Sequence, residues 1–510
     1  MVIRAFTGTV AGIGAVGVTV EVSVTGGGLG LFLVGLPDNA VRESEQRIRS
    51  AFENSGFRMT MRKCVVNLAP ADLRKEGSGF DLPIAVAILA ATEQAAAEPL
   101  AESVFVGELS LDGSIRGVKG VLPIAAEARE RGFKRIYVPR ENASEAAVVA
   151  GIDVLAVESL REVVASLGGE HEIKPEKHIS LEIDGEQFYG EDFADVKGQQ
   201  HAKRALEIAA AGGHNVIMIG PPGSGKTMLA RRMPSILPPM SMAEALETTK
   251  IHSVAGKLGT CKGLMRQRPF RAPHHSASPV ALIGGGQNPQ PGEVSLAHNG
   301  VLFLDEIPEF GHGVLEVLRQ PLEDKRISIS RARYAVEYPS NFTLIASMNP
   351  CPCGYYNHPD KECSCSPAAV HRYMGRISGP LMDRIDLHVE VTPVSRDEIS
   401  SATPAESSAA IRERVVKARQ VQAERFSGTG IHTNTMMSSS MIQRFCPLTA
   451  DARRLLDMAM ERLQLSARAY DRIIKVARTI ADLEGEPDIT PAHISEAISY
   501  RSLDRESWGK

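Results

Sequence analysis

Several features are missing from this 510-residue sequence, and each absence excludes a class of protein. No apolar run approaches the roughly 20 residues that a membrane-spanning helix needs, and the first residues lack the layout of a signal peptide. The formal net charge is −4, so any contact with nucleic acid must come from local basic patches. Seven cysteines in a chain of this length do not indicate a disulfide framework. The sequence therefore predicts a cytoplasmic protein of three or four domains with no membrane contact.

The stretch 220–227 reads GPPGSGKT and matches the phosphate-loop pattern G-x-x-x-x-G-K-[ST]. An apolar run at 216–219 precedes it and good helix formers follow, which predicts a strand, a glycine-rich turn and a helix. Backbone N–H groups of such a loop surround phosphates, while a lysine adds charge and a hydroxyl binds Mg²⁺. The predicted nucleotide-binding residues are Gly220, Pro221, Pro222, Gly223, Ser224, Gly225, Lys226 and Thr227.

Further residues extend this site. Four apolar residues at 301–304 lead into Asp305 and Glu306, which predicts a buried strand ending in a carboxylate for Mg²⁺ and a catalytic base. A strand at 343–347 is expected to place Asn349 beside the γ-phosphate, where it orients water. Val196, in the loop before the phosphate strand, is either an adenine contact or a plain core residue. The predicted cofactors are ATP and Mg²⁺.

The separation of Lys226 from Asp305 is much longer than the ~30 residues of a strand–helix–strand step, so the sequence predicts an insertion between them. Beyond Asp305, residues 326–338 alternate as a hairpin with a basic tip that carries Arg331, Arg333 and Tyr334. This tip is either a solvated charged turn or a loop that binds a nucleic-acid backbone inside a channel.

Two arginines have alternative interpretations. Arg384 lies between acidic residues and is either a salt-bridge partner or an arginine finger for the ATP of a neighbouring subunit. Arg468 starts a helix and is either a surface residue or a contact to the γ-phosphate.

Four cysteines, Cys351, Cys353, Cys363 and Cys365, form a C-x-C-x9-C-x-C pattern. Four thiolates in one loop can hold a tetrahedral Zn²⁺, and the alternative is a buried cluster of reduced thiols. The sequence favours structural zinc beside the nucleotide site.

Residues 1–168 predict a separate α+β domain. The strings KEGSGFDLP (75–83) and GELSLDG (107–113) resemble the Lon protease proteolytic domain, which has a ribosomal S5 domain 2-like fold. That family uses a Ser–Lys dyad, and Ser78 lies near its serine region. Leu122 occupies the place expected for the lysine, and Lys119 is off register. Because a serine hydroxyl needs a base to attack, this domain is expected to be a non-proteolytic scaffold.

The strings RPFRAPHH, GEVSLAHNGVLFLDEIPEF, SMNPCPCG and GPLMDRIDLHVEV resemble the magnesium-chelatase-like AAA+ ATPases, and in particular the ComM/YifB family of competence-associated proteins. The resemblance implies a hexameric ring with pore hairpins, ATP-driven branch migration of single-stranded or branched DNA, and recombination proteins as partners in homologous recombination and natural transformation. It makes Asn349 the sensor 1 residue, Arg384 the arginine finger and Arg468 the sensor 2 residue. A chelatase-type motor that remodels a partner protein is the alternative, followed by an ATP-dependent protease.

The expected fold class is therefore α/β multidomain. The domains predicted are a Lon-protease-like domain at 1–168, a linker at 169–192, a P-loop AAA+ core with a parallel sheet at 193–395, and a helical lid at 396–510.

Overall fold

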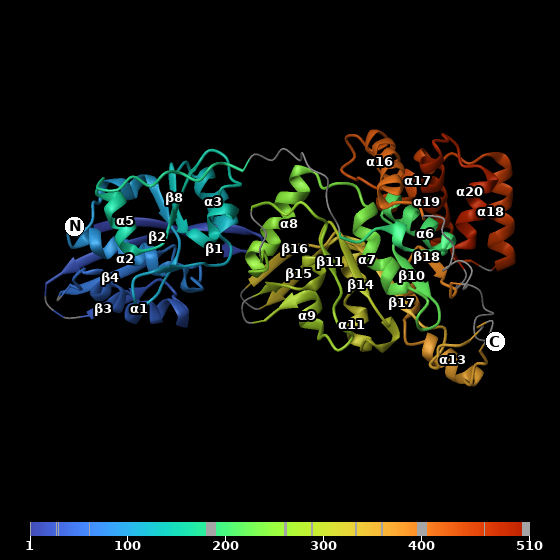
Figure 1. Ribbon diagram of the computed structural model, residues 1–510, viewed down its shortest axis with the longest axis horizontal. Helices are drawn as coiled ribbons and strands as arrows, with labels where there is room; N and C mark the ends of the chain where they lie inside the picture. Colours follow the sequence, from blue (N-terminus) through green and yellow to red (C-terminus); the bar gives the residue numbers. More distant parts are fainter. Residues whose placement is uncertain are drawn as a thin grey trace. The chain divides into compact units, whose positions relative to one another are not determined.

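The computed structural model describes residues 2–501 apart from 27, 29, 61, 180–189, 260–262, 287–288, 332–333, 357, 359–360, 395–404 and 464, and only the backbone of 330, 331, 334 and 335. Residues 180–189 of the predicted linker at 169–192 thus lie outside the described residues. The chain is a mixed α/β multidomain protein (Figure 1). It divides into two compact units: Met1–Asp184 with Met242–Met265, and Gly185–Ser241 with Arg266–Lys510.

The first unit is built on a seven-stranded sheet of order β3-β4-β2-β1-β5-β8-β9, blue to teal in Figure 1. Strands β1, β2 and β4 pair antiparallel, whereas β5, β8 and β9 continue the sheet in parallel from β1. Its elements are β1 (Val2–Ala11), β2 (Gly14–Thr25), β3 (Gly30–Val34), α1 (Asn39–Ser55), β4 (Lys63–Ala69), α2 (Asp81–Ala91), β5 (Ser103–Phe105), β6 (Glu108–Leu109), β7 (Ile115–Arg116), α3 (Val121–Glu130), β8 (Arg135–Pro139), α4 (Ala143–Ala146), β9 (Asp153–Val157), α5 (Leu160–Leu167) and α8 (Met242–Ala255).

The sequence pattern explains much of this unit. Val18, Val20 and Val22 are fully buried on one face of β2, as alternation predicts. Helix α1 ends at Gly56 in the left-handed conformation that glycine favours. Between Ser103 and Leu109 the chain forms two separate short strands, β5 and β6.

The second unit holds a five-stranded sheet of order β11-β14-β17-β10-β18, in which every pair is parallel. The elements up to the last strand are α6 (Gln200–Gly212), β10 (Val216–Ile219), α7 (Lys226–Ile236), β11 (Phe270–Arg271), α9 (Pro279–Ile283), β12 (Gly284–Gly285), β13 (Gln290–Pro291), α10 (Glu293–Leu296), β14 (Val301–Leu304), α11 (His312–Glu316), α12 (Arg319–Asp324), β15 (Arg326–Arg331), β16 (Tyr334–Pro339), β17 (Thr343–Met348), α13 (Pro367–Met374), α14 (Gly379–Met382) and β18 (Leu387–Glu390). The predicted parallel-sheet core is confirmed.

Helices complete this unit, orange to red in Figure 1. They are α16 (Ser408–Arg425), α17 (Ser439–Phe445), α18 (Ala450–Leu463), α19 (Ala467–Glu484) and α20 (Pro491–Ser499). Helices α16 and α19 both pack on α6, so the C-terminal helices share one hydrophobic core with the sheet. Among the helices that the structure describes, none combines the length and hydropathy needed to cross a membrane.

Two hairpins occur between the sheet strands. Strands β12 and β13 form a short one, and β15 and β16 pair from Arg326↔Pro339 to Arg331↔Tyr334. The hydroxyl of Tyr338 donates a hydrogen bond to the carbonyl of Pro289 over 2.8 Å, which ties the second hairpin to the end of the first. Burial raises the pKa of Tyr338 to about 12, so this hydroxyl stays protonated as a donor.

Candidate nucleotide-binding site

The parallel sheet places three functional segments at one edge. Strand β10 is paired with β17, and β17 with β14, so the carboxyl ends of these strands lie side by side. Gly220 follows β10, Asp305 follows β14 and Asn349 follows β17. Segments that are far apart in the sequence thus meet at a single site.

The phosphate loop has the expected strand–turn–helix form. Gly223 and Gly225 have φ values of 79° and 89°, which an L side chain rarely adopts, and α7 begins at Lys226. The Lys226 ammonium donates to the carbonyls of Gly220 at 2.6 Å and Pro221 at 2.9 Å, and to Asn349 Oδ1 at 3.4 Å. Burial lowers the pKa of Lys226. A phosphate would supply the countercharge that these neutral acceptors lack.

The oxygen donors suited to Mg²⁺ are also adjacent. Thr227 Oγ1 donates to Asp305 Oδ2 over 3.1 Å, and the other carboxylate oxygen of Asp305 accepts from the Ser347 hydroxyl. The threonine hydroxyl that ends the phosphate loop and the carboxylate that follows β14 fit the preference of Mg²⁺ for oxygen ligands. Ser347 was missed by the sequence analysis. It is a fully buried polar residue in a mostly apolar strand, two positions before Asn349.

A cavity of about 420 Å³ opens at this edge. Glu306 and Asn349, the predicted base and water-orienting residue, both line it. Glu306 has a φ of 52°, a left-handed conformation that costs a non-glycine residue about 1 kcal/mol, and its backbone N–H donates to Ser347 Oγ over 3.4 Å. Together the lining residues are Glu306, Glu309, Asn349, Pro352, Ala369, Arg372, Tyr373 and Arg376.

Helix α13 contributes Ala369, Arg372 and Tyr373 to the lining of this cavity. Burial, followed by the nearby charge of Glu309, raises the pKa of Tyr373 to about 12, although a hydrogen bond with the Asn349 backbone opposes the shift. The Tyr373 hydroxyl therefore stays neutral at physiological pH. Arg376 pairs with Glu309 at 2.8 Å. The sequence alone does not indicate that α13 lines this cavity, because α13 comes after the cysteine loop and carries no nucleotide motif.

The two predicted arginines both pair with acidic residues outside the phosphate loop. Arg384 forms an ion pair with Glu323 of α12 and donates to the Pro380 carbonyl over 2.6 Å; its side chain is 11% exposed. Arg468, 68% exposed, pairs with Asp383 at 3.0 Å. No contact within the described residues joins either arginine to the phosphate loop. Their roles as arginine finger and sensor 2 stay predictions.

The remaining predicted contacts are placed as follows. Val196 is fully buried in the core of the second unit, so an adenine contact stays a prediction. For the basic hairpin tip, Arg333 lies outside the described residues, and Arg331 and Tyr334 are described by their backbone alone. Their contact with DNA is likewise a prediction.

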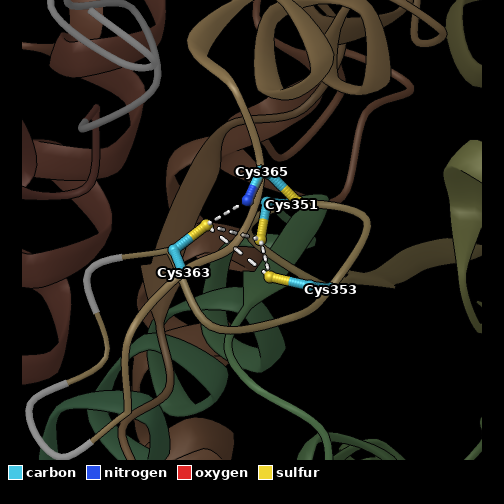
Figure 2. A group of neighbouring side chains, drawn as sticks. All are labelled: Cys351, Cys353, Cys363 and Cys365. Carbon is cyan, nitrogen blue, oxygen red and sulfur yellow. Dashed lines mark hydrogen bonds between the residues drawn. The ribbon is translucent and has the colours of Figure 1, made fainter.

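The four cysteines of the predicted zinc site come together in one loop. Cys351 Sγ lies 3.3 Å from Cys353 Sγ and 3.7 Å from Cys363 Sγ, and all four sulfur atoms lie within 4.8 Å of one another. Figure 2 shows three of these sulfurs turned toward one another. A tetrahedral zinc with Zn–S bonds near 2.3 Å would hold sulfurs roughly 3.8 Å apart, so the donor set and its spacing fit a metal ion.

One thiol of this cluster is already acidic. Although burial opposes it, hydrogen bonds from the Tyr355 backbone and the Cys351 side chain lower the pKa of Cys353 to about 6. The thiolate is the form that binds metals.

The cysteine loop also contacts the phosphate loop. Gly354 has a φ of +84°, and a Cβ built on it would lie 2.6 Å from Cδ of Pro222. The backbone of the cysteine loop therefore packs directly on the second proline of GPPGSGKT, and the shape of one loop constrains the other.

In the first unit, the hydroxyl of Ser78 donates a hydrogen bond to the Glu108 carboxylate. Leu122, which stands where the resemblance to the Lon domain would place the dyad lysine, is fully buried in α3. The described contacts of Ser78 thus include a carboxylate and no lysine.

Three family models match different parts of this chain. The family model described as "Magnesium chelatase, subunit ChlI" matches residues 192–399, "Subunit ChlI of Mg-chelatase" matches 20–142, and the model of the ChlI C-terminal part matches 405–501. The "Uncharacterized protein YifB" of Escherichia coli is 46% identical over 97% of this chain and 96% of its own length.

Two further relatives are informative. The "Competence protein ComM" of Haemophilus influenzae is 46% identical over 96% of this chain and 95% of its own length. The "Magnesium-chelatase 67 kDa subunit" of Heliobacterium mobile is 27% identical over 41% of this chain and 34% of its own length. Similarity over nearly the full length is thus to YifB and ComM, whereas similarity to the chelatase subunit is partial.

Proposed function

The chain belongs to the ComM/YifB family of magnesium-chelatase-like AAA+ proteins, and from this premise we propose that it is an ATP-hydrolysing ring motor acting on DNA. The activity we propose is branch migration, with unwinding of single-stranded or branched DNA, during homologous recombination and natural transformation. The observation that carries the proposal is the convergence of Lys226, Thr227, Asp305 and Asn349 at one sheet edge, beside a cavity lined by Glu306.

ATP hydrolysis needs three tasks, and the described residues can perform each. The phosphate loop and Lys226 bind the phosphates, and Thr227 with Asp305 would hold Mg²⁺, which supplies charge neutralisation when bound. Glu306 faces the cavity as the general base, and Asn349 orients the attacking water. Ser347 fixes both carboxylate segments, because its hydroxyl donates to Asp305 and accepts from the Glu306 backbone.

The remaining parts support a ring. An arginine that stabilises the transition state can be supplied by an adjacent subunit, and the described contacts of Arg384 are with Glu323 and Pro380, not with its own phosphate loop. We therefore assign Arg384 as a finger for the adjacent subunit in a hexamer, with Arg468 as sensor 2. The tip of the β15–β16 hairpin, with Arg331, Arg333 and Tyr334, would grip DNA in the pore.

The other domains take supporting roles in this proposal. Residues 1–168 would be a Lon-protease-like scaffold without peptidase activity, joined by 169–192 to the AAA+ core at 193–395, and residues 396–510 would form the helical lid. The four cysteines would hold a structural zinc. The protein would act in the cytoplasm together with recombination proteins.

Branch-migration assays on synthetic four-way junctions test the proposal. Wild-type protein should convert labelled junctions to duplex arms only with ATP and Mg²⁺, and Lys226→Ala should abolish conversion by removing the phosphate charge. Conversion by Lys226→Ala at the wild-type rate would contradict the motor.

The partial similarity to a magnesium-chelatase subunit favours a second candidate, a motor that remodels a partner protein for metal insertion. Under that alternative, ATP turnover would respond to a protein partner and ignore DNA.

A further inference from the structure

The segment that carries Arg384 is held by helix α19 of the C-terminal helices. Arg468 and Arg472 lie four residues apart on α19 and so share one face of it. Arg468 pairs with Asp383 at 3.0 Å, and Arg472 pairs with Asp386 at 2.6 Å. Because Asp383 and Asp386 flank Arg384, both sides of the arginine are attached to the same helix face.

The pair at Asp386 is the buried one. Asp386 is 6% exposed, and it also accepts the backbone N–H of Asn215 at 3.1 Å and lies 3.5 Å from the His214 ring. Burial alone would raise the pKa of Asp386, but the charge of Arg472 and the contact with His214 hold it well below its usual range. A buried carboxylate that loses the arginine paired with it is strongly destabilised, so α19 and residue 386 are constrained to stay together.

The backbone of Arg384 is fixed to the sheet. Asn215, the residue before β10, donates its side-chain amide to the Arg384 carbonyl over 2.9 Å and accepts the Leu344 N–H of β17 over 2.9 Å. The position of the Arg384 carbonyl is thus fixed relative to the sheet that carries the phosphate loop.

The guanidinium of Arg384 is held less firmly than its backbone. It is held by Glu323, whose side chain is 60% exposed, and by the Pro380 carbonyl at 2.6 Å, and its buried Nε has no hydrogen-bond partner among the described residues. An exposed carboxylate is a weak competitor for an arginine in water. A shift of α19 against the sheet would therefore change where this guanidinium points.

We propose that Arg472 and Asp386 are positioning residues for Arg384. The C-terminal helices of one subunit would thus set the position of the arginine that this subunit provides to the nucleotide of its neighbour. The inference rests on the proposed ring with shared ATP sites. Arg472 touches no nucleotide in this scheme and acts through residues 383–386. The pairing of Arg468 with Asp383 gives the same helix a second attachment.

Subunit mixing tests this directly. Lys226→Ala subunits cannot bind phosphate but carry an intact Arg384, whereas Arg472→Ala subunits carry an intact phosphate loop. Alone, Arg472→Ala should lose about tenfold or more in kcat while its KM for ATP changes less than about twofold. In an equimolar mixture with Lys226→Ala, ATP turnover should exceed that of either variant alone, because the two defects then fall in different sites.

The opposite result is equally clear. If Arg472→Ala damages only its own site, the mixture stays as inactive as its components, and the inference is overturned. Asp383→Asn provides a second variant in case Arg472→Ala does not fold, because Asp383 is 39% exposed. It should show a smaller kcat loss that Lys226→Ala subunits also complement; a loss that the mixture does not restore overturns the inference.

Two controls separate this inference from the proposed function. Arg384→Ala mixed with Lys226→Ala should regain turnover; if that mixture stays inactive, the shared-site ring fails and the inference fails with it. If that mixture recovers and the Arg472→Ala mixture does not, only the inference fails. Arg454→Ala removes an exposed α18 pair with Asp451 and should leave turnover unchanged.

Discussion

At the scale of single residues, Ser347 joins Asp305, the carboxylate proposed to bind Mg²⁺, to Glu306, the proposed catalytic base. Its hydroxyl donates to Asp305 and accepts from the backbone N–H of Glu306. Ser347→Ala leaves both groups without that partner, at a cost of about 1–3 kcal/mol when buried. We expect kcat for ATP to fall about tenfold with Kd for ATP within threefold of wild type, because the phosphate loop is untouched.

Steady-state turnover and binding of a fluorescent ATP analogue measure the two quantities. Ser340→Ala is the matched control, since Ser340 is also a fully buried serine and its hydroxyl has no hydrogen-bond partner among the described residues. Equal kcat losses in the two variants would show that the effect of Ser347 is general destabilisation.

Residues of this site differ in how far the sequence predicts them. Lys226 and Thr227 are recognised because the loop motif is contiguous and its strand and helix are local. Ser347 and Tyr373 are not, since their roles depend on β17 lying beside β14 and on α13 folding back over the site. No local pattern encodes which strands become neighbours.

At the scale of elements, the cysteine loop supports the phosphate loop through Gly354 and Pro222. In Gly354→Ala, the added Cβ would meet Pro222 at 2.6 Å, so one of the two loops must move. We expect Kd for ATP to rise about tenfold, equivalent to about 1.4 kcal/mol.

Gly428→Ala is the control for backbone strain alone. Gly428 has a similar φ of +76°, and a Cβ there would meet no atom within 4 Å. This variant should lose some stability without weakening ATP binding. Unchanged ATP affinity in Gly354→Ala would contradict the coupling between the loops.

Metal content tests the same element. Elemental analysis should find about one zinc per chain, since four thiolates complete a closed structural site. Cys363→Ser should release it and weaken ATP binding by loosening the loop against Pro222. Cys64→Ala, which changes a buried cysteine of the first unit, should keep the zinc. Wild-type protein that binds no zinc even after zinc is supplied would refute the assignment.

The strands, like the site residues, differ in how far the sequence predicts them. The sequence predicts β10, β14 and β17 well, because runs of three or four apolar residues indicate buried parallel strands. It misses β1, whose buried residues include Thr7 and Thr9 and so interrupt the apolar alternation. Only its long antiparallel pairing with β2 identifies it as a strand.

At the scale of the whole molecule, the insertion after the phosphate helix divides its parts between the two units. Residues Met242–Met265, with α8, pack with the first unit, and the backbone N–H of Gly120 donates to the Ser253 carbonyl over 3.1 Å. The length of the insertion is readable from the sequence. Its partner is not, because α8 has no motif that identifies the surface it covers.

The central claim is that ATP cleavage in this protein is coupled to DNA, and the most direct measurement is the ATPase rate with forked, duplex and single-stranded DNA at fixed salt. The account predicts that forked or single-stranded DNA raises kcat of the wild type severalfold and that Lys226→Ala shows no turnover with any DNA. Turnover that is the same with and without each DNA would contradict the account.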